Sequence, residues 1–75
     1  MREKVMEILS GIRPDIDFDV EDKLVSDGLL ASLDVVVIVD ALSDEYGINI
    51  KPKDLLAENF NSVEAIIALI ERLLK

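Results

Sequence analysis

Two adjoining segments organise this chain: Asp27-Gly28-Leu29-Leu30-Ala31-Ser32-Leu33-Asp34 and Val35-Val36-Val37-Ile38-Val39. Serine is a preferred helix N-cap, because its oxygen accepts a hydrogen bond from an otherwise unpaired backbone N–H. We therefore expect Ser32 to cap a helix that begins directly behind it. Asp34 then falls in the first turn, where the helix dipole favours negative charge. The same helix end would hold a phosphate group well.

Length and composition limit the classes of protein to consider. A chain of 75 residues predicts one domain, residues 1–75, of modest stability, because so short a chain buries only about 60% of its unfolded surface. The sequence has no Cys and no His. Their absence excludes disulfides, Ser–His–Asp and Cys–His catalysis, and thiolate or imidazole metal sites. The three glycines form no phosphate-binding loop. We expect neither an enzyme nor a metal centre.

No segment predicts membrane insertion or export. No apolar run approaches the length of a membrane span, and Met1-Arg2-Glu3-Lys4 opens no secretory signal. We expect a soluble, cytoplasmic monomer.

The net charge of −8 is concentrated in one part of the chain. Residues 14–50 carry ten acidic residues against Lys23 alone, whereas residues 1–13 carry a net +1 and residues 51–75 are neutral overall. Such a field repels nucleic acid and anionic membranes and attracts basic surfaces. A solvated acidic face that only keeps the protein soluble explains the pattern equally well.

Three segments carry apolar residues at helical spacing and predict the main helices. The stripes are Val5, Ile8, Leu9 and Ile12 in residues 2–12; Val35, Ile38, Val39, Leu42 and Tyr46 in residues 32–46; and Val63, Ile66, Ile67, Ile70 and Leu74 in the last segment. The β-branched run in the second segment has strand propensity. Its length, its cap and Gly47 at its end favour a helix.

The remaining elements are smaller. Pro52 suits the start of a short helix through Ala57, and residues 59–61 are expected to form a loop. Either Asn61 or Ser62 caps the last helix, with Glu64 placed for a capping box if Asn61 is the cap.

Residues 13–31 are expected to form a long loop that lies on the helical core. Its apolar anchors are Ile16, Phe18, Leu24, Val25, Leu29 and Leu30. Asp15, Asp17 and Asp19 match the first three ligand positions of an EF-hand. The match then fails, because Val20 stands where Gly is needed and Ser26 where Glu is needed. We expect no calcium site there.

The chain resembles the acyl carrier protein family, which includes peptidyl, aryl and D-alanyl carrier proteins. The resemblance covers nearly the whole length and rests on Asp27-Gly28-Leu29-Leu30, Ser32-Leu33-Asp34, Glu45-Tyr46-Gly47-Ile48-Asn49-Ile50 and Asn59-Phe60-Asn61-Ser62-Val63-Glu64-Ala65-Ile66. It implies an all-α, acyl-carrier-like bundle of three main helices and one short helix, with a long loop between the first two. The run that starts at Glu58 is more similar to aminoacyl-type or stand-alone carriers than to fatty acid synthesis proteins.

The resemblance also implies a modification and a set of partners. In this family the serine of an Asp-Ser-Leu motif receives 4′-phosphopantetheine from coenzyme A, and the matching residues are Ser32 and Leu33. The arm would carry acyl or aminoacyl groups as thioesters in fatty acid, polyketide or nonribosomal peptide biosynthesis. The implied partners are a phosphopantetheinyl transferase, an acyl or aminoacyl ligase or transferase, and synthases with basic docking surfaces.

Two positions depart from the family pattern. Ala31 stands where the family has an Asp that is expected to help engage the transferase, and Val37 stands where a docking Glu is frequent. Partner docking would then depend on apolar contact through Val36 and Val37, with Asp40 and Asp44 as anchors for basic residues. The sequence leaves open whether the two valines face solvent or pack against the loop.

Ala31 also keeps open a function of a different class. An unmodified acidic helical module could use the same fold as a scaffold or regulatory subunit. A third interpretation, a cation buffer, rests only on the acidic loop.

Overall fold

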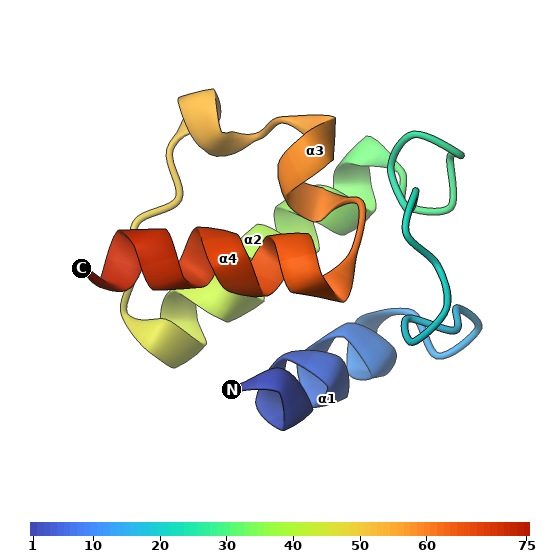
Figure 1. The fold of residues 1–75 in the computed structure, drawn as a ribbon, viewed down its shortest axis with the longest axis horizontal. Helices are drawn as coiled ribbons and strands as arrows, with labels where there is room; N and C mark the ends of the chain where they lie inside the picture. The colour runs from blue at the N-terminus through green and yellow to red at the C-terminus, as the bar shows by residue number, and fades with distance from the viewer.

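The computed structural model describes residues 1–75 and contains helices but no strands, which confirms the predicted all-α fold class. The elements are α1 (Arg2–Ile12), α2 (Ser32–Tyr46), a 3₁₀ turn η1 (Pro52–Asp54), α3 (Ala57–Phe60) and α4 (Val63–Leu74). Helix α1 packs on α2 and α4, and α3 packs on α4. The long loop between α1 and α2 covers one end of the bundle (Figure 1). None of the helices is long and apolar enough to cross a bilayer.

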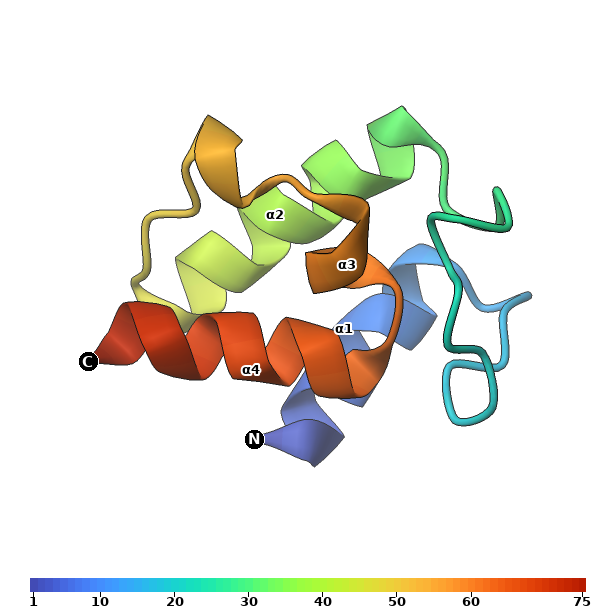
Figure 2. The ribbon, with the colours of Figure 1, turned by 45° about the horizontal axis from the view of Figure 1, so that its top comes forward.

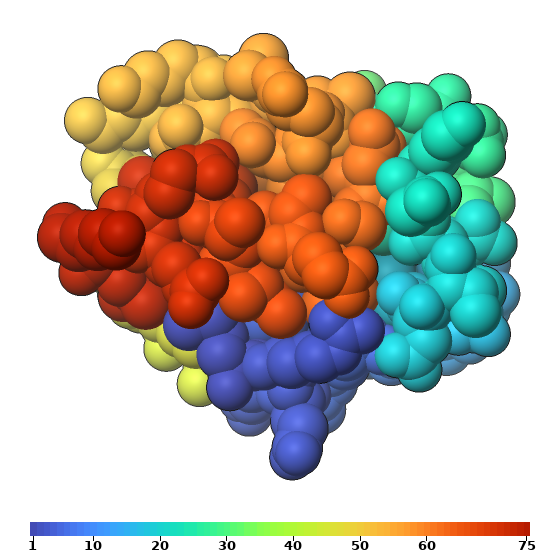
Figure 3. Space-filling view, in the orientation of Figure 1, coloured from blue at the N-terminus to red at the C-terminus, as the bar shows by residue number.

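The core consists of 13 buried residues, all of them apolar. They are Val5, Leu9, Phe18, Leu24, Leu30, Ile38, Leu42, Ile48, Phe60, Val63, Ile66, Leu69 and Ile70. Three of them, Phe18, Leu24 and Leu30, come from the long loop, and the loop's other predicted anchors are half-buried against the same cluster. Figure 3 shows the loop packed closely against the start of α4. The loop is therefore part of the hydrophobic core, as its apolar anchors predicted.

The face of α4 differs from its prediction at two positions. Leu74 is 50% exposed and does not belong to the core, whereas Leu69, which lies outside the predicted stripe, is fully buried. The reason is that α4 packs on both α1 and α3, so its buried face is wider than a single stripe, and Leu74 is the last residue of the helix.

The segment between α2 and α4 also differs from its prediction. Only residues 52–54 form the turn that starts at Pro52, and the short helix lies later, at Ala57–Phe60. Asn59 and Phe60, which were expected in a loop, belong to α3. Burial of the Phe60 ring explains the shift, and the Asn59 side chain supports it by donating to the Asp54 carbonyl at 2.8 Å.

Two helix ends are set by local chemistry. Gly47 ends α2 in the left-handed conformation (φ 62°), as its position predicted. Ser62 is the N-cap of α4, and its Oγ accepts a hydrogen bond from Ala65 N–H at 3.1 Å. Because Ser62 rather than Asn61 is the cap, Glu64 forms no capping box and instead pairs with Arg2 of α1.

Candidate functional site

The first turn of α2 begins one residue earlier than predicted. Ala31 is the N-cap, and Ser32 is the first helical residue rather than the cap. Alanine has no side-chain acceptor, so Ala31 cannot accept a hydrogen bond from the first turn. The side chain of Asp34 in that turn instead contacts the backbone of Ala31. Asp34 Oδ2 accepts a hydrogen bond from Ala31 N–H at 3.0 Å, which is the acidic half of a capping box. Asp34 does lie in the first turn, as predicted.

This arrangement leaves the start of α2 free to bind an anion. The first backbone donor of the helix is Val35, whose N–H reaches the Ala31 carbonyl at 3.1 Å. The N–H groups of Ser32, Leu33 and Asp34 have no protein acceptor. Ser32, in the same turn, is exposed. Unpaired amides and the positive end of the helix dipole favour a phosphate at this position, so these residues fit a phosphodiester on the Ser32 hydroxyl.

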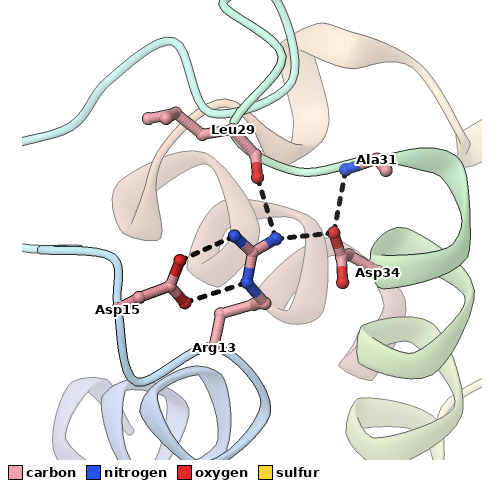
Figure 4. A network of polar contacts seen from close by, with 5 residues as sticks. All are labelled: Arg13, Asp15, Leu29, Ala31 and Asp34. Atoms are coloured by element: carbon pink, nitrogen blue, oxygen red, sulfur yellow. Dashed lines mark hydrogen bonds and ion pairs between the residues drawn. The ribbon is translucent and has the colours of Figure 1, made fainter.

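Arg13, at the C-terminal end of α1, links this turn to the rest of the molecule (Figure 4). Its Nη1 donates to Asp34 Oδ2 at 2.7 Å and to the Leu29 carbonyl at 3.0 Å. Its Nε and Nη2 donate to the two carboxylate oxygens of Asp15 at 3.0 and 2.8 Å. One guanidinium therefore joins the end of α1, the end of the long loop and the first turn of α2.

The charges in this network stabilise one another. The hydrogen bonds from Arg13 hold the pKa of the Asp15 carboxyl below its ordinary value. The same hydrogen bonds, followed by the charges of Asp15 and Asp34, raise the pKa of Arg13. Arg13 and Asp15 are thus both ionised at neutral pH.

An open apolar groove of about 560 Å³ lies beside Ser32. The long loop forms one wall of the groove, α2 forms its floor, and residues 55–60, which include α3, form the other wall. Figure 2 shows the segment that includes α3 lying over the N-terminal half of α2. The lining residues are Val25, Leu30, Ala31, Ser32, Val35, Val36, Leu55, Leu56, Ala57 and Phe60. Ser32 is the one polar residue among them.

The predicted docking residues all lie on the surface. Val36 is 59% and Val37 44% exposed, so neither valine packs under the loop. Asp40 and Asp44 are exposed on the same helix, and Ala31 and Leu33 are exposed at its start. Ala31 and Val36 share the groove with Ser32. Val37, Asp40 and Asp44 follow at intervals of three and four residues and therefore share one outer face of α2.

Sequence reasoning missed two parts of this site. It assigned no role to Arg13, because nothing in the sequence pairs residue 13 with residue 34. It placed Leu55 and Leu56 inside a short helix, whereas both are exposed residues that line the groove. The one signal in the sequence that could have indicated their exposure is that Leu55 and Leu56 directly follow the turn that begins at Pro52.

Comparison with known proteins identifies the family of the chain. A family model described as phosphopantetheine attachment site matches residues 2–70. Searches among curated proteins and among solved structures gave no match. The prosthetic group of the family is 4′-phosphopantetheine, and its members are carrier domains that act with phosphopantetheinyl transferases and synthase enzymes. With an all-helical fold and a match over most of its length, the chain belongs to the phosphopantetheine attachment site family of acyl carrier proteins.

Proposed function

We propose that this protein carries acyl or aminoacyl groups as thioesters on a 4′-phosphopantetheine arm attached to Ser32, and presents them to partner enzymes without catalysing a reaction itself. The observation that carries the proposal is the position of Ser32, an exposed hydroxyl at the start of a helix whose first three amides are unpaired.

The other serines lack this combination. Ser10 lies inside α1, and Ser43 is half-buried inside α2. The Ser26 hydroxyl accepts a hydrogen bond from Asn61 at 3.0 Å, and Ser62 caps α4. Of the five serines in the sequence, only Ser32 therefore offers a free hydroxyl where a helix end favours the phosphate that modification would add.

In the proposed modification Ser32 Oγ forms a bond to the pantetheine-side phosphorus of coenzyme A. The phosphoanhydride bond breaks, 3′,5′-adenosine diphosphate leaves, and the serine proton passes to a base of the transferase. The free amides of residues 32–34 then face the new phosphodiester. The arm supplies the thiol that this Cys-free chain lacks.

The groove supports a cargo with an apolar part. Apart from the Ser32 hydroxyl its lining residues are apolar, and it opens directly beside the attachment residue. Apolar surface that leaves water for such a groove gains about 25 cal/mol per Å². An aliphatic or aromatic acyl or aminoacyl group therefore suits it better than a charged one.

The outer face of α2 supports partners with basic and apolar surfaces. Helix α2 contains four acidic residues and no basic residue. Val36 and Val37 provide exposed apolar contact beside Asp40 and Asp44. Complementary charge speeds encounter and fixes register. We propose the modifying transferase, a loading ligase or transferase, and downstream synthases as the proteins that dock here.

Intact mass spectrometry tests the proposal. The purified protein is incubated with coenzyme A and a broad-specificity phosphopantetheinyl transferase, with Ser32→Ala in parallel and Ser10→Ala as the matched control. We expect a gain of one phosphopantetheine in the wild type and in Ser10→Ala and none in Ser32→Ala. Equal labelling of Ser32→Ala would show that the attachment residue is wrong.

If the wild type is not labelled while a known carrier in the same tube is labelled, the experiment is repeated with the variant Ala31→Asp. Labelling of that variant would show that Ser32 is competent and that Ala31 limits recognition. If the variant also stays unlabelled, the carrier proposal is wrong and the scaffold function is favoured.

A further inference from the structure

We propose that Arg13 is a positioning residue for the modification of Ser32, and that it acts through Asp34. This inference rests on the proposed function, because it assumes that Ser32 is the residue modified. Arg13 lies 21 positions before Asp34 in the sequence and is joined to it at 2.7 Å in the fold.

The guanidinium is held in one orientation. Asp15 binds it through two parallel hydrogen bonds, from Nε and from Nη2. Such a planar fork fixes geometry as well as charge. Nη1 is therefore presented toward α2, where it donates both to Asp34 Oδ2 and to the Leu29 carbonyl. These two acceptors lie on either side of Ser32 in the sequence.

Asp34 connects Arg13 to the backbone next to Ser32. The oxygen that accepts from Arg13 also accepts from Ala31 N–H at 3.0 Å. Ala31 is the N-cap, and its own side chain has no acceptor with which to fix the turn. The Arg13–Asp34 pair is thus the polar contact that fixes the backbone immediately before Ser32.

The pair is more constrained than an ordinary surface ion pair. The side chains of Arg13 and Asp34 are only 28% and 24% exposed. By comparison, the partners in the Arg2–Glu64 pair are about half or more exposed. Exposed pairs contribute little to order, because two long side chains remain free to move. Each member of the Arg13–Asp34 pair is instead held by other residues. Arg13 donates three further hydrogen bonds, two to Asp15 and one to Leu29, and Asp34 accepts one more from Ala31 N–H.

Steady-state kinetics of phosphopantetheine transfer from coenzyme A to Arg13→Gln, Arg13→Lys and the wild type test the inference. Loss of the pair frees the serine turn, and a small misplacement of a reacting atom is costly. We expect kcat of Arg13→Gln to fall about tenfold with KM for the carrier within about twofold. Arg13→Lys should recover part of the loss, because an ammonium can still reach Asp34 but cannot make the two-pronged contact with Asp15.

Two controls separate positioning from stability. Arg2→Gln removes the arginine at the opposite end of α1, which pairs with Asp19 and Glu64 rather than with Asp34. Ile70→Val removes one methylene-sized group from the core in α4. Ile70→Val should lower the melting temperature, Arg2→Gln should change it little because its ion pairs are exposed, and both variants should leave kcat unchanged. A similar fall of kcat in either control would overturn the positioning role, as would an effect of Arg13→Gln confined to KM.

A double-mutant cycle tests whether Arg13 acts through Asp34. Asp34→Asn should reduce kcat, and the double variant should be no worse than the more impaired single variant. Multiplicative losses would show that the two residues act separately and would overturn the inference. Modification of the wild type and Arg13→Gln at equal rates would overturn the inference alone. No modification of the wild type or of Ala31→Asp would overturn the proposed function with it.

Discussion

Asn61 Oδ1 accepts a hydrogen bond from the backbone N–H of Val25 at 3.0 Å, across 36 positions of the sequence. The same oxygen accepts from Ser26 N–H at 3.0 Å, and Asn61 Nδ2 donates to Ser26 Oγ. The Asn61 carbonyl accepts from Leu24 N–H at 2.9 Å. A single residue between α3 and α4 thus holds the part of the loop that forms one wall of the groove, since Val25 lines it.

Replacing Asn61 by Ala should therefore loosen the loop. The Val25 N–H would lose its acceptor in a part-buried position, and an unsatisfied group of this kind costs about 1–3 kcal/mol. We expect a loss of that size in chemical denaturation, together with faster hydrogen exchange at Val25 and Ser26. Asn61→Asp keeps the acceptor oxygen and should retain most of the exchange protection. Unchanged exchange at both amides in Asn61→Ala would contradict the role of this contact.

The fold was largely predictable because its helices bury regular apolar stripes. Val5 and Leu9, or Ile38 and Leu42, lie where helical spacing places them. Spacing alone failed in α4. Leu69 is buried because α4 packs on two helices, which the sequence does not show, and Leu74 is exposed because it is the last residue of the helix. It also failed at Phe60, whose burial extended α3 into an expected loop.

The site was predictable only in part. The helix start near Ser32 follows from local composition, but the assignment of Ser32 as the cap was wrong, because Asp34 satisfies the N–H of Ala31 instead. The contacts that hold the turn and the loop come from Arg13 and Asn61, which bind residues far away in the sequence. Local patterns carry no information about such pairs.

The contact between Arg13 and Asp15 should make stability depend on pH. Hydrogen bonds from Arg13 lower the pKa of folded Asp15 below its ordinary value of 3.8. The pair therefore stabilises the fold fully above that ordinary value, and the contribution is lost as the pH falls through the lowered pKa of the folded state. We expect the melting temperature of Asp15→Asn to lie below that of the wild type at pH 6, and the gap to close below about pH 4.

Asp22→Asn, at an exposed aspartate of the same loop, serves as the charge control for this experiment. It removes one negative charge without touching Arg13. If the difference in melting temperature between Asp15→Asn and the wild type stayed the same down to pH 2.5, the stabilisation would not depend on the charge of the Asp15 carboxylate.

Two buried residues test the core. Leu42 of α2 and Ile66 of α4 are both fully buried, and truncation of such residues to Ala costs about 2–5 kcal/mol, because apolar contact is lost and a cavity remains. We expect each variant to lose that much stability in urea unfolding, which for a small domain is a large part of the total. Leu74→Ala, at the half-exposed end of α4, should change stability by less than about 0.5 kcal/mol. A loss at Leu74 equal to that at Ile66 would contradict the observed face of α4.

The outer face of α2 should control encounter with the transferase. Asp40→Asn combined with Asp44→Asn removes two exposed charges that attract basic surfaces. We expect KM for the carrier to rise about three- to tenfold, with kcat little changed and a weaker dependence of kcat/KM on salt. Glu3→Gln with Glu7→Gln, on exposed positions of α1, is the matched control of equal charge. An equal rise of KM in the control would show that net charge, rather than this face, governs docking.

Crowding of negative charge should make the fold more stable in salt. Residues 14–50 carry a net charge of −9 within a chain whose radius of gyration is 11.0 Å, which is close to the screening length of about 10 Å at 0.1 M salt. Added salt therefore weakens repulsion between most of these groups, while the mostly exposed ion pairs contribute little that screening can remove. We expect the melting temperature to rise by about 5 °C, equivalent to about 1 kcal/mol, between about 10 mM and 500 mM sodium chloride.

Asp27→Lys, at an exposed position in the acidic region, should raise the melting temperature at low salt and make it depend less on salt concentration. A melting temperature that does not change with salt would mean that repulsion among these carboxylates costs the fold nothing measurable.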